Sequence, residues 1–119
     1  MEQIIHITGK IPSANEYIGA CRTNAHVGAR MKADIERMIM IQLIRMKPIE
    51  EPIYLEFTWH ERTRRRDKDN VAFGKKFVLD AMQKCGKLPN DNNAYIIGFS
   101  DRFDYDNGDY GVTVKIRGE

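Results

Sequence analysis

The sequence predicts an α+β fold in which a small mixed β-sheet is packed by two main helices. Two segments, residues 2–8 and 53–60, alternate between apolar and polar side chains, as half-buried strands do. Two longer segments, residues 25–46 and 69–84, repeat apolar residues at the three-and-four spacing of an amphipathic helix. With 119 residues, of which 42% are hydrophobic and 30% charged, the chain is expected to form a single domain over residues 1–119.

The first predicted strand, residues 2–8, is rich in isoleucine and ends at Gly9 and Pro12. Residues 10–24 contain Pro, Gly, Ser and Asn without an apolar period, so a loop is predicted there. The second strand ends at His60. This histidine is either a general base at the mouth of a site or a surface side chain on the polar face of the strand.

The helix predicted for residues 25–46 is apolar nearly all round between Met38 and Ile44, where only Gln42 interrupts it. A helix with this pattern is expected to be covered on two sides. The sheet provides one cover, and either a second subunit or a tightly wrapped loop provides the other. The segment around Met38 to Ile44 is therefore the predicted dimer surface.

The second main helix is predicted to begin at Asp69 or Asn70, either of which suits an N-cap, and to end near Lys84 before Gly86. The remaining elements are predicted as a loop at 87–93, a short strand at 94–99, a hairpin turn at 100–109 and a strand at 110–116. The four aspartates of that turn do not fit a calcium-binding loop, because the required glycine and closing glutamate are missing. A solvated turn is the favoured interpretation.

The net charge of +2 is mild, but positive charge is concentrated at the end of the second strand. Four arginines lie there and run directly into Asp67 and Asp69; they are Arg62, Arg64, Arg65 and Arg66. Guanidinium groups bind phosphate oxygens as rigid forks. Two acids spaced two apart point the same way in an extended backbone, which suits Mg²⁺. The segment therefore predicts a site where a polyanion and a metal meet.

A helical projection of the following segment adds a lysine to this site. At about 100° per residue, Lys76 falls about 20° from the direction of Asp69, and Asp80 falls about 20° on the other side, whereas Lys75 lies off that line. A third acid, Asp91, follows the helix in a turn-like run that could return to the first two. Acids for a metal ion and a cation for developing phosphate charge are what phosphodiester hydrolysis requires.

The same residues carry a resemblance to a known family. The chain resembles the RusA family of Holliday-junction resolvases, strongly over residues 62–91 and loosely elsewhere. The motifs that carry the resemblance are Arg64-Arg65-Arg66-Asp67-Lys68-Asp69-Asn70, Lys76, Leu79-Asp80-Ala81-Met82, Gly86, Asn90-Asp91 and, near the start, Pro12-Ser13-Ala14-Asn15-Glu16-Tyr17.

The resemblance implies a RusA-like fold and a small homodimeric, Mg²⁺-dependent endonuclease that cuts four-way DNA junctions in recombination and repair. It implies that Asp67, Asp69 and Asp91 bind the metal and that Lys76 is the catalytic lysine. The candidate accessory residues are Asp80, Asn15 and Asn70.

Two features depart from the family pattern. About three additional residues separate Asp69 from Lys76, which leaves Lys75 as the alternative catalytic lysine. Asn90 stands where an acid is often found.

A function from another class is also compatible with the sequence: a non-catalytic nucleic-acid-binding module in which the arginines bind phosphate and the aspartates only pair with them. Cys21 and Cys85 have no zinc-ligand spacing and are expected to be free thiols. The chain has no long apolar run and no secretory signal, so a cytoplasmic protein without a membrane partner is expected.

Overall fold

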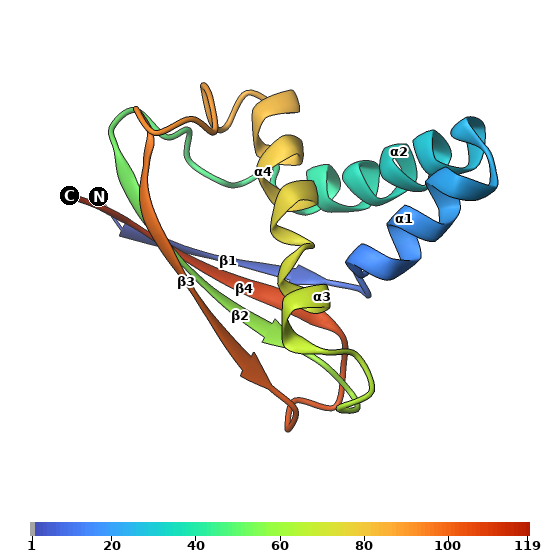
Figure 1. Cartoon of the computed structure of the whole chain (residues 1–119). Coiled ribbons are helices and arrows are strands. Elements are labelled where there is room, and N and C mark those ends of the chain that lie inside the picture. The colour runs from blue at the N-terminus through green and yellow to red at the C-terminus, as the bar shows by residue number, and fades with distance from the viewer. Residues whose placement is uncertain (1) are drawn as a thin grey trace.

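The computed structural model describes residues 2–119 and is built on a four-stranded sheet in the order β1-β4-β2-β3 (Figure 1). The strands are β1 (Glu2–Thr8), β2 (Ile53–His60), β3 (Ile96–Asp104) and β4 (Gly111–Gly118). Strand β4 runs antiparallel to both β1 and β2, whereas β2 and β3 are parallel. The mixed sheet and the α+β class predicted from the sequence are thus confirmed.

The helices are α1 (Ala14–Thr23), α2 (Ala25–Gln42), α3 (Lys68–Ala72) and α4 (Lys75–Lys84), and they cover one face of the sheet (Figure 1). Burial alternates along β2 and β4, as expected when one face of the sheet is covered and the other is open. Phe57 and Trp59 of β2 and Val114 of β4 are at most 2% exposed, whereas their polar neighbours are more accessible. The opposite face of the sheet therefore carries the polar side chains.

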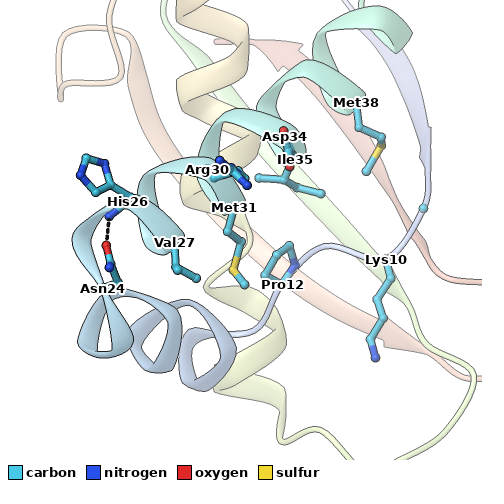
Figure 2. Close-up of a pocket in the computed structure, with 11 residues that line it drawn as sticks. Lys10, Pro12, Asn24, His26, Val27, Arg30, Met31, Asp34, Ile35 and Met38 are labelled. Carbon is cyan, nitrogen blue, oxygen red and sulfur yellow. Dashed lines mark hydrogen bonds between the residues drawn. The ribbon is translucent and has the colours of Figure 1, made fainter.

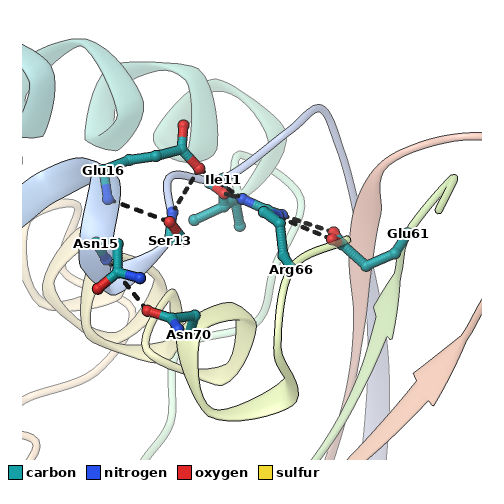
Figure 3. Close-up of polar contacts among 7 residues, drawn as sticks. All are labelled: Ile11, Ser13, Asn15, Glu16, Glu61, Arg66 and Asn70. Atoms are coloured by element: carbon teal, nitrogen blue, oxygen red, sulfur yellow. Dashed lines mark hydrogen bonds and ion pairs between the residues drawn. The ribbon is translucent and has the colours of Figure 1, made fainter. Parts of the chain in front are cut away.

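The prediction of a loop over residues 10–24 was wrong, because α1 occupies most of that segment. Helix α1 starts with a capping box: the Ser13 side chain accepts a hydrogen bond from the Glu16 backbone N–H, and the Glu16 carboxylate accepts one from the Ser13 N–H (Figure 3). This pairing satisfies two backbone donors that a helix start leaves free. Ser13 and Glu16 have the capping-box spacing, which the sequence interpretation overlooked.

The single helix predicted up to Lys84 is two helices, α3 and α4, joined at Gly74. Three of the backbone hydrogen bonds there, donated by Gly74, Lys76 and Phe77, span three residues rather than four, as in a tightened turn. A side chain at position 74 does not fit, because a Cβ would lie 2.8 Å from Ile11 Cγ2 and 3.1 Å from Trp59 Cζ3. The N-cap of α3 is Asp67, not Asp69 or Asn70. Gly86, with a φ of 77°, does end α4 as predicted.

The hairpin predicted for residues 100–109 was also wrong. Strand β3 extends to Asp104, and β2 lies between β3 and β4 in the sheet. Residues 105–110 therefore cross the end of β2 instead of joining two neighbouring strands. The expected turn at Asn107-Gly108 is present, since Gly108 has a φ of 79°.

Helix α2 ends at Gln42, earlier than predicted, and a turn follows it. Ile39 and Leu43 are fully buried, whereas Ile41 and Ile44 are 63% and 71% exposed. The apolar segment is thus covered by the chain on one side and open on the other. Within residues 2–119, none of the helices has both the length and the apolar character needed to cross a lipid bilayer.

Candidate nucleic-acid interface

The arginine-rich segment, residues 62–68, is an exposed loop that leaves the end of β2 and enters α3; it is called the basic loop below. Arg64 and Arg65 are exposed. The Arg64 guanidinium carbon lies 4.0 Å from the centre of the Tyr105 ring, and Lys68 Nζ lies 5.7 Å from the same centre. Cation–π contacts of this kind keep long basic side chains extended over the surface without neutralising their charge.

Arg62 is also available to an anion. Its Nη2 donates to Asp109 Oδ1 at 2.8 Å, and the side chains of Arg62 and Asp109 are 56% and 63% exposed. The hydrogen bond that Arg62 donates to Asp109 raises the pKa of Arg62. An exposed pair such as this contributes little and can be exchanged for phosphate. The Arg62 guanidinium also lies 5.3 Å from the centre of the Tyr110 ring.

Tyr105 and Tyr110 were missed by the sequence interpretation. Both flank the acidic crossover of residues 105–110, which was interpreted only as a solvated turn. Their contact with the basic loop depends on the order of strands in the sheet, which brings that crossover beside the end of β2. The spacing of aromatic residues alone could not have shown it.

Arg66 does not belong to the accessible set. Its Nε and Nη2 donate to the two carboxylate oxygens of Glu61 at 2.8 and 2.6 Å, and its Nη1 donates to the Ile11 carbonyl and to Glu16 (Figure 3). Glu61 is 3% exposed. Burial lowers the pKa of Arg66, but the hydrogen bonds that it donates to Glu61 and Glu16, together with their negative charges, raise the pKa overall. The placement of Arg66 corrects its predicted role: it fixes the basic loop to the segment before α1 rather than facing solvent.

The carboxylates of Asp67 and Asp69 are exposed and make no hydrogen bond or ion pair with any of residues 2–119. Asp67 caps α3 through its backbone only, and Asp69 lies in the first helical turn. The backbone is therefore helical at Asp69. The prediction that an extended backbone points the two acids the same way was wrong. Hard oxygen donors with no partner nevertheless fit a divalent cation such as Mg²⁺.

Asp91 does not join these two acids within one chain. It lies in the loop that precedes β3, whereas Asp67 follows the end of β2. The parallel register pairs Ile53 with Ile96 and His60 with Asp104, so the two loops lie at opposite ends of an eight-residue strand. Such a strand is about 23 Å long. Across residues 2–119, no three acidic, histidine or cysteine side chains are arranged to hold a metal.

The two lysines at the start of α4 differ in environment. Lys75 Nζ donates to Asp101 Oδ2 at 2.8 Å, lies 3.7 Å from the centre of the Phe99 ring, and belongs to a side chain that is 14% exposed. Lys76 is 58% exposed, and its Nζ lies 3.3 Å from Asp80 Oδ1. Lys76 and Asp80 therefore form an i,i+4 ion pair on α4. Asp69 and Lys76 do not share one face of a continuous helix as projected, because the helix is interrupted at Gly74.

The remaining candidate residues have partners inside the fold. Asp80 is 8% exposed and also pairs with Lys32 of α2 at 3.1 Å. Asn70 Oδ1 accepts a hydrogen bond from the backbone N–H of Asn15 at 3.2 Å, which joins α3 to the first turn of α1 (Figure 3). Asn15 and Asn70 therefore hold the start of α1 against α3, which follows the basic loop, whereas Asp80 lies between α4 and α2.

A separate hollow of about 740 Å³ lies along α2 and the segment after β1 (Figure 2). Its lining is mostly apolar and includes Val27, Met31, Ile35 and Met38. None of the predicted site residues lines it. The basic loop, not this hollow, is therefore the candidate site.

Comparison with known proteins adds no assignment: no protein-family model matches the chain, and no curated protein matches it. The resemblance to the RusA family thus depends on the motifs alone.

Proposed function

We propose that the protein is a Mg²⁺-dependent, structure-selective endonuclease that cuts four-way DNA junctions as a homodimer. The observation that carries the proposal is the pair of unpartnered carboxylates, Asp67 and Asp69, beside the exposed guanidinium groups of Arg64 and Arg65. Adjacent opposite charges that served only stability would be expected to pair with one another. Their separation leaves the acids for a cation and the arginines for phosphate.

Arg64 and Arg65 bind phosphate, and Arg62 joins them when phosphate replaces Asp109 as its partner. The Tyr105 ring contacts the Arg64 guanidinium, and the Tyr110 ring contacts that of Arg62. Contacts to phosphate position a duplex but carry no sequence information. Selectivity for a branched structure would then follow from how two such loops in a dimer are placed, and binding would weaken steeply with salt.

The fit of the acids to Mg²⁺ rests on their exposure and their lack of partners. Asp67 and Asp69 would hold the ion, which when bound activates a water and neutralises phosphate charge. Lys76, exposed and tethered by Asp80, would place its ammonium group against the leaving oxygen. Lys75 is committed to Asp101 and to the Phe99 ring, which favours Lys76 as the catalytic lysine.

The position of Asp91 requires a second copy of the chain. Ligand oxygens of one Mg²⁺ lie about 2.1 Å from it, which an acid at the far end of β2 cannot satisfy. In the proposed dimer, Asp91 of one copy approaches Asp67 and Asp69 of the other. The exposed Ile41 and Ile44 at the end of α2 are the proposed contact between copies. Two equivalent sites would cut the two opposed strands of a junction.

The direct test is cleavage of a synthetic four-way junction by the purified protein with Mg²⁺. Asp69→Asn is expected to abolish cutting and to retain junction binding, because it removes a metal ligand and a negative charge near phosphate. The matched control is Asp34→Asn, which changes an exposed aspartate on α2 and is expected to cut normally. Equal cutting by the wild type and Asp69→Asn would refute the proposal.

The lysine assignment has its own test with the same substrate. Lys76→Ala is expected to lose cutting, whereas Lys75→Ala should keep much of it under conditions where the variant is folded, as checked by circular dichroism. The reverse result would assign the catalytic role to Lys75.

A second function, non-catalytic nucleic-acid binding, is favoured by the position of Asp91 within one chain. In that case the protein binds DNA or RNA but cuts no junction with any divalent metal. Replacing Arg65 by Ala should still weaken binding and reduce the slope of log affinity against log salt by about 0.9. Cutting, not binding, therefore separates the two functions.

A further inference from the structure

The polar face of the sheet, opposite the helices, carries a row of four hydrogen-bonded side chains near the end of β2. His60 Nδ1 lies 2.7 Å from Asp104 Oδ2, and His60 Nε2 lies 2.8 Å from Thr113 Oγ1. His6 Nδ1 lies 3.2 Å from the same Thr113 oxygen. The row therefore spans all four strands, from Asp104 on β3 to His6 on β1.

The carboxylate of Asp104 decides which nitrogen of His60 carries a hydrogen. Asp104 Oδ1 accepts a hydrogen bond from the backbone N–H of Asp106 at 3.0 Å, and its Oδ2 faces His60 Nδ1. A carboxylate oxygen accepts hydrogen bonds, so Nδ1 of His60 is the donor. In the neutral ring, Nε2 then presents a lone pair towards Thr113. A carboxylate that orients one ring nitrogen while the other faces outward is the usual arrangement behind a metal-binding histidine.

The second histidine converges on the same point. His6 lies on the edge strand β1 directly across from Thr113, and its ring is exposed. His60 Nε2 and His6 Nδ1 both reach Thr113 Oγ1, so a small ion can contact both nitrogens after minor side-chain adjustment. A hollow of about 340 Å³ lies at this place, lined by both histidines, Asp109 and Tyr110 among others.

We propose that His6 and His60 bind a divalent transition-metal ion of the Zn²⁺ class on this face of the sheet. The site is independent of the proposed Mg²⁺ site, because imidazole nitrogens suit Zn²⁺ and its neighbours in the first transition row, whereas Mg²⁺ prefers oxygen. His60 contributes Nε2, and His6 contributes Nδ1 after its ring hydrogen moves to Nε2. The remaining positions around the ion are filled by water. Asp104 is a positioning residue that fixes the His60 ring.

The chain offers a matched control, since its three histidines are His6, His26 and His60 and His26 lies on α2, away from the row. Isothermal titration of the full-length protein with Zn²⁺ is expected to show binding that His6→Gln or His60→Ala weakens at least tenfold. Asp104→Asn is expected to weaken it by about 10- to 100-fold. His26→Ala should leave it unchanged.

His6→Gln is the decisive variant, because an exposed residue on an edge strand can change without unfolding the chain. Absence of Zn²⁺ binding by the wild type, or equal affinity of the wild type and His6→Gln, would overturn the proposal. Neither outcome bears on junction cutting with Mg²⁺, so the two proposals fail separately.

Discussion

Replacing Arg66 by Ala should destabilise the protein far more than the same change at the neighbouring Arg65. Arg66 makes two hydrogen bonds, at 2.8 and 2.6 Å, to the carboxylate of Glu61, whose side chain is 4% exposed. Removing one partner of a buried ion pair leaves the other charge without compensation, which costs about 3–5 kcal/mol. The Arg66 side chain is 15% exposed, so the lower end of that range, about 3 kcal/mol, is expected.

Urea unfolding of the two variants, followed by circular dichroism at neutral pH, measures this difference. Arg65→Ala changes an exposed side chain and should alter the free energy of unfolding by less than about 0.5 kcal/mol. Glu61→Gln combined with Arg66→Ala should lose less than the sum of the two single changes, because the residues interact directly. Equal stability of Arg66→Ala and Arg65→Ala would refute the structural role of Arg66 and return it to the set of phosphate ligands.

Two further predictions concern packing and pH. Gly74→Ala should destabilise the protein by about 1–3 kcal/mol in urea unfolding, since the new Cβ would lie 2.8 Å from Ile11. Gly19→Ala, with open space around it on α1, should instead stabilise the protein by about 0.5–1 kcal/mol. A change in unfolding free energy of the same sign for both variants would contradict the close packing at Gly74. Burial raises the pKa of Glu16, but hydrogen bonds from Ser13 and Arg66 lower it below the ordinary value of 4.5, so its contribution to stability is present above pH 4.5 and is lost as the pH falls through the folded-state pKa. The urea midpoint of the wild type should therefore drop more steeply below pH 4.5 than that of Glu16→Gln, and parallel curves would contradict this.

The strands could be predicted closely because their alternation is a local property of the sequence. Residues 2–8 and 53–60 form β1 and β2 with the predicted bounds. One face of each strand packs against helices and the other is polar, so the period of two is visible without knowledge of the fold. Helix α1 escaped prediction because it is short, with ten residues of which only Ala20 is buried, and is specified instead by its capping box and by packing against α2.

Only those features of the candidate site that depend on neighbouring residues in the sequence could be predicted. The exposure of Arg64, Arg65, Asp67 and Asp69 follows from a polar run between a strand and a helix. The commitment of Arg66 could not be seen, because its partners come from the end of β2 and from the segment before α1. The break at Gly74 likewise depends on Ile11 and Trp59, which are distant in sequence.

The position of Asp91 depends on topology rather than on sequence spacing. Its motif follows the helical segment at a distance that allowed a return to Asp67 and Asp69. The parallel pairing of β2 and β3 instead requires the chain to travel back along α3 and α4 to the start of β2 before β3 begins. One chain therefore holds the two halves of the proposed metal site at opposite ends of the sheet.

The proposed metal site is tested most directly by dimers of two different inactive copies. One copy carries Asp67→Asn and Asp69→Asn, the other carries Asp91→Asn, and each has its own affinity tag so that the mixed dimer can be isolated. If Asp91 acts across the dimer, the mixed dimer contains one complete site and should cut a four-way junction with Mg²⁺, whereas both parent dimers remain inactive. A mixed dimer as inactive as its parents, or a dimer of Asp91→Asn copies that cuts like the wild type, would contradict the proposal.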